Sequence, residues 1–165
     1  MDLNTKGRYA VMAMADLAKF SASCEAANPE MNSVPLSAIS GRQGLSLAYL
    51  EQLFAKLRRE GLVESARGRS GGYRLARHPG DITIAAIMRA VEEPMKMTRC
   101  ELGEPGCVGH ARCLTHDLWN ALGDHIMAFL GDVTLKDVVE GMPGHKGAMR
   151  ARASHLTVSP GVAAE

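Results

Sequence analysis

The sequence has few aromatic residues and no long hydrophobic run. Phe, Trp and Tyr make up 4% of its 165 residues, so a broad aromatic surface that stacks on single-stranded nucleic acids is not expected. No segment approaches the roughly 18 apolar residues that predict a membrane span. The charged N-terminal stretch MDLNTKGRYAVMAMADLAKF also lacks the apolar core of a secretory signal. These absences favour a cytoplasmic protein that does not contact a membrane.

The sequence also lacks the patterns of common enzyme classes. It contains no Cys-x-x-Cys motif and no strand–helix frame around its thiols, which disfavours a thiol redox enzyme. It shows no Ser/His/Asp order, no paired carboxylates and no phosphate loop that would indicate hydrolysis or group transfer. We therefore expect a protein that is not an enzyme.

The charges are unevenly distributed, although the net charge is only +1. Residues 1–80 carry 11 Lys and Arg against 7 Asp and Glu, whereas residues 81–165 carry 8 against 11. Between residues 37 and 77 there are 8 basic residues against 3 acidic ones. A partner made of phosphate would therefore bind the first half of the chain.

The hydrophobic pattern of the first half predicts helices. Apolar residues recur at helical spacing from Ala10 to Ala18, and this pattern ends at the polar stretch SASCEAANPEMNS. A short helix is expected over 35–42, with Pro35 in its first turn, and the sequence GLS then makes a tight corner. A longer helix reads LAYLEQLFAKLRREG, with Ser46 as its N-cap and Gly61 as its end. The residues expected to be buried in it are Leu47, Leu50, Leu53, Phe54 and Leu57.

Two short strand-like runs, LVESAR and YRLAR, follow and are joined by GRSGG. This order of elements is that of a winged helix-turn-helix, in which the helix after the turn fits the major groove of DNA. The hairpin sequence RGRSGGYR also places three arginines around three glycines, where the backbone can approach a phosphate closely. We favour a double-stranded DNA operator as the partner. A helical bundle with a basic surface is the alternative.

The second half predicts a helix at ITIAAIMRAVEE and a long amphipathic helix at LTHDLWNALGDHIMAFLGDVT. One small domain offers little surface to cover the apolar side of the long helix, so a second copy is its expected partner, giving a homodimer. The fold class is therefore mainly α with a small β-wing, a winged helix-turn-helix plus a long dimerisation helix. The expected domains are a DNA-binding domain over 1–80, a cluster-binding loop with the dimerisation helix over 81–140, and a disordered tail over 141–165.

The segment CELGEPGCVGHARCLTH holds three of the chain's four cysteines and two of its six histidines. Its spacing is Cys-x6-Cys-x5-Cys-x2-His, so Cys100, Cys107, Cys113 and His116 form a set of four ligands. Such a set also binds structural zinc, although zinc ligands usually come in pairs about two to four residues apart. The wider cysteine gaps favour a larger group with two irons, each taking about two protein ligands.

Other assignments of this segment remain open. His110 is a competing imidazole, but a loop position gives it no fixed direction. Only Cys113 and His116 are close together, and we expect them on one face of the first turn of the long helix. Cys24 is far away in the sequence and is interpreted as a bystander. Three unrelated cysteines are the least favoured interpretation.

Four stretches are specific enough to compare with a known family: LNTKGRYAV, PLSAISGRQGLSLAYLEQLFAKLRREGLV, RGRSGGYRL and RC…GC…RCLTHDLW. From about Leu3 to about Gly141, the chain resembles the IscR family of bacterial iron–sulfur cluster regulators. The resemblance implies a homodimeric winged-helix repressor of cluster-assembly genes, with the assembly machinery as cluster donor. It also implies a 2Fe–2S cluster held by Cys100, Cys107, Cys113 and His116.

The resemblance further implies that Tyr49, Glu51, Gln52 and Arg67 contact DNA. Ser46 and Lys56 complete the DNA-binding residues that we expect. The sequence departs from the family pattern around Cys24, where extra residues are expected only to lengthen a loop. It also departs in the wing, where Arg69-Ser70 replaces Pro-Gly and puts operator preference in doubt. A related cluster regulator that senses nitric oxide or iron, and a zinc-stabilised DNA-binding protein, are the alternatives.

Overall fold

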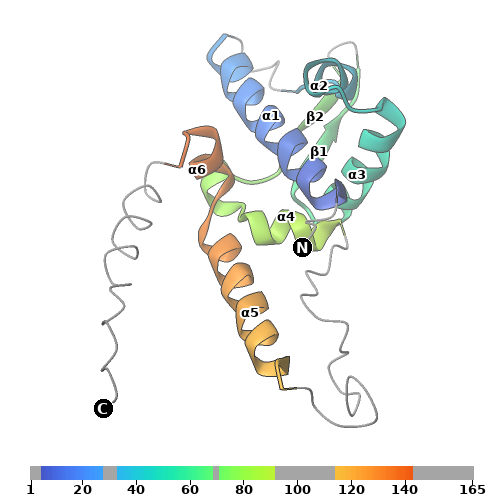
Figure 1. The fold of residues 1–165 in the computed structure, drawn as a ribbon. Coiled ribbons are helices and arrows are strands. Elements are labelled where there is room, and N and C mark those ends of the chain that lie inside the picture. Colours follow the sequence, from blue (N-terminus) through green and yellow to red (C-terminus); the bar gives the residue numbers. More distant parts are fainter. Residues whose placement is uncertain (1–4, 28–32, 69–70, 92–113, 143–165) are drawn as a thin grey trace, which may run out of the picture.

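The computed structural model describes residues 5–27, 33–68, 71–91 and 114–142, with the backbone alone described for 22–27. The elements in these residues are α1 (Thr5–Ala27), α2 (Leu36–Gln43), α3 (Leu47–Arg59), β1 (Val63–Ala66), β2 (Gly72–Leu75), the 3-10 helix η1 (Pro79–Asp81), α4 (Ile84–Ala90), α5 (His116–Asp132) and α6 (Leu135–Val139). Helices predominate and the two strands form a small hairpin (Figure 1). The expected fold class, a mainly helical winged helix-turn-helix with a long helix after it, is confirmed.

Helix α1 is longer than expected. Its buried face is the predicted one, with Ala10, Met14, Leu17 and Ala18 in the core. The expected end near Ser21 is wrong, because the helix continues to Ala27. No Gly or Pro interrupts SASCEAA, and Ala and Glu favour helix. The residues around Cys24 therefore extend a helix and do not only lengthen a loop.

The turn between α2 and α3 has the geometry of a helix-turn-helix. Pro35 is the N-cap of α2 and precedes its first turn, one position earlier than expected. Gly44 ends α2 with φ of 65°, in the left-handed region that glycine adopts without strain. The hydroxyl of Ser40 donates to the carbonyl oxygen of Leu45 at 2.6 Å. Ser46 occupies the N-cap position of α3, as expected, although its side chain makes no capping hydrogen bond.

Helix α3 buries Leu50, Leu53, Phe54 and Leu57 as predicted. Leu47 is 42% exposed and does not belong to the core, so its assignment to the buried face is corrected. It is the first residue of the helix, where the chain has only just left the turn. The helix ends as expected, because Gly61 has φ of 66° and its N–H donates to the carbonyl of Arg58 at 3.0 Å.

The wing is an antiparallel hairpin in which Val63 faces Leu75 and Ala66 faces Gly72. It is joined to the chain before α2 by a bridge, in which Val34 and Tyr73 exchange backbone hydrogen bonds of 2.8 and 2.9 Å. Gly72 lies against this bridge. A Cβ atom built on Gly72 would lie 2.5 Å from the carbonyl carbon of Val34, so only glycine allows this approach.

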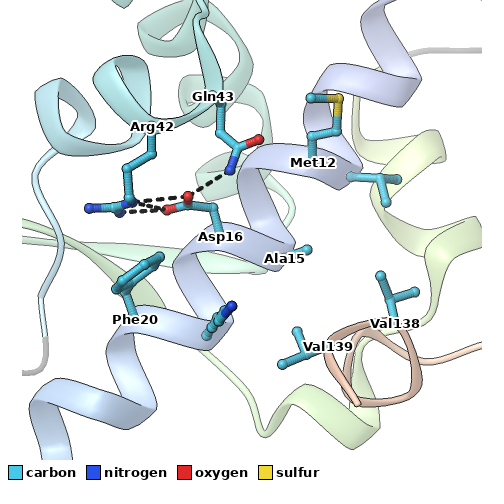
Figure 2. Close-up of a pocket in the computed structure, with 10 residues that line it drawn as sticks. Met12, Ala15, Asp16, Phe20, Arg42, Gln43, Val138 and Val139 are labelled. Carbon is cyan, nitrogen blue, oxygen red and sulfur yellow. Dashed lines mark hydrogen bonds and ion pairs between the residues drawn. The ribbon is translucent and has the colours of Figure 1, made fainter. Parts of the chain in front are cut away.

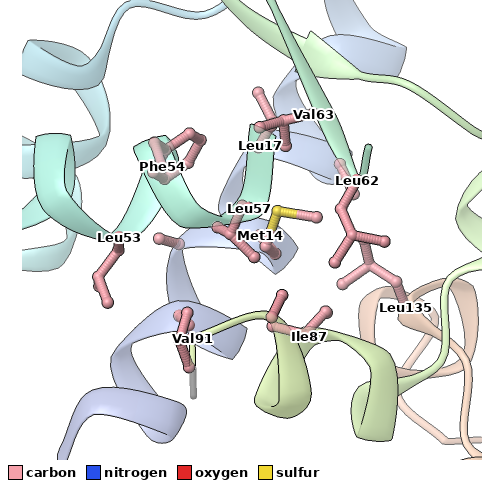
Figure 3. Packing of buried hydrophobic residues seen from close by; sticks show 14 of the residues in the cluster. Met14, Leu17, Leu53, Phe54, Leu57, Leu62, Val63, Ile87, Val91 and Leu135 are labelled. Carbon is pink, nitrogen blue, oxygen red and sulfur yellow. The ribbon is translucent and has the colours of Figure 1, made fainter. Parts of the chain in front are cut away.

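The core joins both halves of the chain. Met14, Leu57 and Val63 belong to one buried cluster with Ile87 of α4 and Leu135 of α6 (Figure 3). Leu135, the first residue of α6, is fully buried, and α6 contacts α1. A capping box fixes the start of α6, since Thr134 and Asp137 each accept a hydrogen bond from the other's backbone N–H. The sequence analysis did not anticipate α6, and the expected domain boundaries at 80 and 140 stay a prediction.

Helix α5 extends away from the other helices (Figure 1). It begins at His116, and Leu114 and Thr115 form a turn before it. Cys113 lies outside the described residues, so the expectation that it shares the first helical turn with His116 stays a prediction. Within the described residues, no helix combines the length and apolar character that a membrane crossing requires. The expected disordered tail lies outside the described residues from position 143 onward.

Candidate functional site

A buried ion pair sets the position of the turn before α3. Asp16 of α1 has a side chain that is only 1% exposed. Its carboxylate accepts hydrogen bonds from Nε and Nη2 of Arg42, at 3.0 and 2.5 Å, and from Nε2 of Gln43 at 2.8 Å (Figure 2). The guanidinium carbon of Arg42 lies 3.9 Å from the ring centre of Phe20. The last two residues of α2 are thus bound to α1 directly before the helix-turn-helix corner.

The expected DNA-reading residues lie on the outer side of α3. Glu51 and Gln52 are exposed, whereas Tyr49 and Lys56 are half-buried. The ring of Tyr49 packs edge-to-face on that of Tyr9 from α1, with centroids 6.1 Å apart and an interplanar angle of 87°. Ser46 is exposed at the start of the helix. The side chain of Tyr49 is therefore positioned by α1, whereas Glu51 and Gln52 face solvent.

The wing is fixed relative to α3 by two contacts. The ring of Phe54 packs on that of Tyr73, with centroids 4.9 Å apart, and Nη1 of Arg58 donates to the hydroxyl of Ser65 at 3.5 Å. Arg67 follows β1 and is exposed. Gly68 follows with φ of 108°, so the chain turns sharply at the tip. Two contacts thus join the wing to α3, and Arg67 is exposed directly after β1.

Sequence reasoning missed the residues that position the helix-turn-helix and the wing. Tyr9 and Asp16 lie in α1, Arg58 is an exposed residue near the end of α3, and none of them carries a motif of its own. Asp16 could have been found, because it interrupts the apolar sequence MAMADLA on the buried face of α1 and is 5% exposed. A buried carboxylate requires a cationic or hydrogen-bonding partner.

A hollow of about 560 Å³ lies beside this ion pair (Figure 2). Its apolar wall comes from α1 and α6, including Met12, Ala15, Val138 and Val139. Its polar lining is the carboxylate of Asp16 with Arg42 and Gln43, together with Lys19. Asp16, Arg42 and Gln43 already bind one another beside the hollow.

Helix α5 carries large apolar side chains that the described residues leave exposed. Leu118, Trp119 and Phe129 are 61%, 38% and 43% exposed, and α5 has no fully buried residue. The helix contacts α4 along part of its length. Exposed apolar surface of this kind in a soluble domain usually marks a protein interface.

Only one of the four candidate ligands, His116, lies within the described residues. Cys100, Cys107 and Cys113, together with the competing His110, lie outside the described residues. His116 is the first residue of α5 and is half-buried. Its Nε2 is 2.8 Å from Nδ2 of Asn120. The imidazole of His116 is thus held by Asn120, which lies one turn further along α5.

The comparisons with known proteins agree with this geometry. The chain matches the Rrf2 family, described as iron-dependent transcriptional regulators, over residues 3–141. The HTH-type transcriptional regulator IscR of Xenorhabdus nematophila is 49% identical over 140 residues, covering 85% of this chain and 80% of that protein. The protein of the same name from Enterobacter sp. is 48% identical over 139 residues, covering 84% and 80%.

Two solved structures are also similar. CymR (YrzC), the global cysteine regulator of B. subtilis, has a TM-score of 0.68 and 33% identity, covering 85% of this chain and 97% of that one. T. potens IscR has a TM-score of 0.64 and 34% identity, covering 98% and 94%. Each similarity extends well beyond the winged-helix region.

Proposed function

Because the chain belongs to the Rrf2 family of iron-dependent transcriptional regulators, we propose that it senses iron–sulfur cluster supply and represses cluster-assembly genes. The family is one of transcription regulators, so the chain is a DNA-binding protein and not an enzyme. It would work in the cytoplasm, where the bacterial chromosome lies, and would receive its cluster from the assembly machinery.

In this proposal α3 enters the major groove of an operator and the wing contacts the flanking DNA. Glu51 and Gln52 are exposed on the outer side of α3, where a carboxylate can accept from a cytosine amino group and a carboxamide can pair with adenine. Arg67 is exposed at the wing, and Tyr49, Ser46 and Lys56 would complete the contacts. The local excess of basic residues between 37 and 77 favours binding to phosphate.

The cluster would be of the 2Fe–2S type, held by Cys100, Cys107, Cys113 and His116. The donor chemistry fits this group, since three thiolates and one imidazole give each of two irons a pair of protein ligands. His116 also fits, because it stands at the start of a helix with its ring held by Asn120 at 2.8 Å. When bound, the cluster would supply a redox-active centre with a higher potential than an all-cysteine site, because imidazole is neutral.

Two copies of the chain would bind the operator together. The exposed apolar residues of α5 provide a surface that a second α5 can cover, and a two-fold dimer presents two α3 helices to a palindromic site. Zinc in place of the cluster, with a structural role only, is the second candidate for the four ligands. A related regulator that senses nitric oxide or iron would use the same fold and ligands.

The observation that carries the proposal is the pair of exposed polar residues, Glu51 and Gln52, on the helix after the turn, in a chain 49% identical to an HTH-type regulator over 140 residues. We would test it by selection from a pool of random duplexes, using anaerobically prepared protein with its cluster and the same protein after chelator treatment. The proposal expects a palindromic duplex to be enriched, with a different preference once the cluster is removed. Failure of both forms to enrich any duplex would contradict it.

A further inference from the structure

The imidazole of His116 is held on one side by a neighbour on the same helix. Nδ2 of Asn120 lies 2.8 Å from Nε2 of His116, and both side chains are half-buried. We propose that Asn120 positions His116 so that Nδ1, and not Nε2, is the nitrogen that binds the cluster. This inference depends on the proposed function, because it takes His116 to be a ligand.

The contact follows from helix geometry. His116 and Asn120 are four residues apart on α5, and side chains at this spacing lie on the same face, one turn apart. Side chains on a helix also lean toward its N-terminus. Asn120 therefore approaches His116 from the C-terminal side and contacts Nε2. Cys113, another expected ligand, stands three positions before His116 in the sequence.

The chemistry of imidazole then assigns a role to each nitrogen. A ring nitrogen whose lone pair binds iron cannot share a hydrogen bond with a carboxamide. A neutral imidazole that binds through Nδ1 carries its proton on Nε2, where it must donate to an acceptor. The carboxamide of Asn120 has both a donor and an acceptor end, so it can turn over and accept that proton through Oδ1.

Asparagine is thus suited to His116 in both states of the protein. Before the cluster binds, the Nδ2 amide can donate to an unprotonated Nε2, and afterwards Oδ1 can accept from the Nε2 proton. The proton passes between the two ring nitrogens through solvent, with no change in oxidation state. Metal-bound histidines usually donate their second N–H to such a partner, and loss of that partner commonly weakens metal binding about 10- to 100-fold.

Three variants separate these roles. Asn120→Leu removes both the donor and the acceptor at similar size, whereas Asn120→Asp keeps an acceptor for the Nε2 proton. Asp124→Asn is the matched control, since Asp124 is exposed one further turn along α5. We expect Asn120→Leu to lose its cluster to a chelator about 10- to 100-fold faster than the wild type. Asn120→Asp and Asp124→Asn should stay within about threefold of it, because both leave the Nδ1 geometry intact.

The identity of the bound nitrogen is measured with histidine labelled with ¹⁵N at Nδ1 alone. In the reduced protein, the strong hyperfine coupling should come from ¹⁵N in the wild type, and Asn120→Leu should show a mixture or a coupling from ¹⁴N. In the cluster-free protein with histidine labelled with ¹⁵N at both ring nitrogens, the Nε2 resonance of His116 should move in Asn120→Leu and stay in place in Asp124→Asn. A strong ¹⁴N coupling in the wild type would overturn the inference while leaving His116 as a ligand. A cluster with no strongly coupled nitrogen would overturn the ligand assignment of the proposed function itself.

Discussion

The carboxylate of Asp16 and the guanidinium of Arg42 join α1 to the end of α2, at distances between 2.5 and 3.1 Å. Asp16 is buried, while the Arg42 side chain is 32% exposed. The two residues are 26 positions apart in the sequence. Arg42 stands two positions before Gly44, at which α2 ends and the helix-turn-helix corner begins. The end of α2, directly before the helix-turn-helix corner, is therefore held by a buried residue of α1.

Asp16→Ala should lower the free energy of unfolding by about 1.5–3 kcal/mol, because it removes charge-assisted hydrogen bonds to a buried carboxylate. The partial exposure of Arg42 keeps the loss below that of a fully buried pair. Urea unfolding would measure it, with Glu64→Ala as the control. The pair between Glu64 and Arg74 is about half exposed on both sides, so its loss should cost less than about 1 kcal/mol. Equal destabilisation by the two substitutions would contradict a structural role for Asp16.

Gly72→Ala should destabilise the wing by about 1–3 kcal/mol, because its Cβ would lie 2.5 Å from the Val34 carbonyl carbon and backbone there would have to shift. Gly41→Ala is the matched control, since nothing lies within 4 Å of its Cβ position. Within helix α2, alanine at position 41 should stabilise by about 0.5–1 kcal/mol. Thermal unfolding of both variants gives the comparison. A neutral Gly72→Ala would show that the wing does not depend on its approach to Val34.

Arg67→Ala should weaken binding to the selected operator by about 1–3 kcal/mol, the range for one good base contact. Lys56→Ala provides the contrast. If Lys56 contacts phosphate alone, its loss should weaken binding to all duplexes alike. It should also reduce, by about one, the slope of the logarithm of the binding constant against the logarithm of salt concentration. Titrations at several salt concentrations, with operator and with scrambled duplex, separate the two effects. An equal loss on both duplexes for Arg67→Ala would exclude base reading by Arg67.

Leu122→Glu should convert the proposed dimer into monomers, because it places a carboxylate in the apolar stripe that a second copy would cover. Ala128→Glu adds the same charge at an exposed position on another face of α5 and should leave the dimer intact. Sedimentation equilibrium at micromolar concentration measures both. A monomeric wild-type protein under these conditions would contradict the proposed assembly.

The elements that sequence predicted well are those whose signals are local. The buried side of α3, its end at Gly61 and the glycine-rich hairpin each follow from residues within a few positions of one another. Pro35 and Ser46 were placed within one residue because helix ends have strong residue preferences. The fold class followed from the order of these elements.

The features that sequence could not give depend on contacts between distant segments. The Asp16–Arg42 pair and the Tyr9–Tyr49 contact each join α1 to residues of the helix-turn-helix. A single sequence can show that a buried Asp16 needs a partner, but it does not identify which distant residue the partner is. The extension of α1 to Ala27 does not follow from the apolar pattern, because SASCEAA is polar; it follows from the lack of a helix-breaking residue there. Helix α6 was missed because it has only five residues, too few for a periodic pattern. Its capping box, Thr134 with Asp137, was the available signal.

The central claim is that this chain holds an iron–sulfur cluster on a DNA-binding fold, and metal analysis with anaerobic absorption spectra tests it most directly. Protein purified without oxygen should contain about two irons and two sulfides per chain and absorb in the visible range. His116→Ala should hold less iron, and Asp124→Asn should match the wild type. A colourless protein with about one zinc and no sulfide per chain would contradict the claim and assign the four ligands to a structural zinc site.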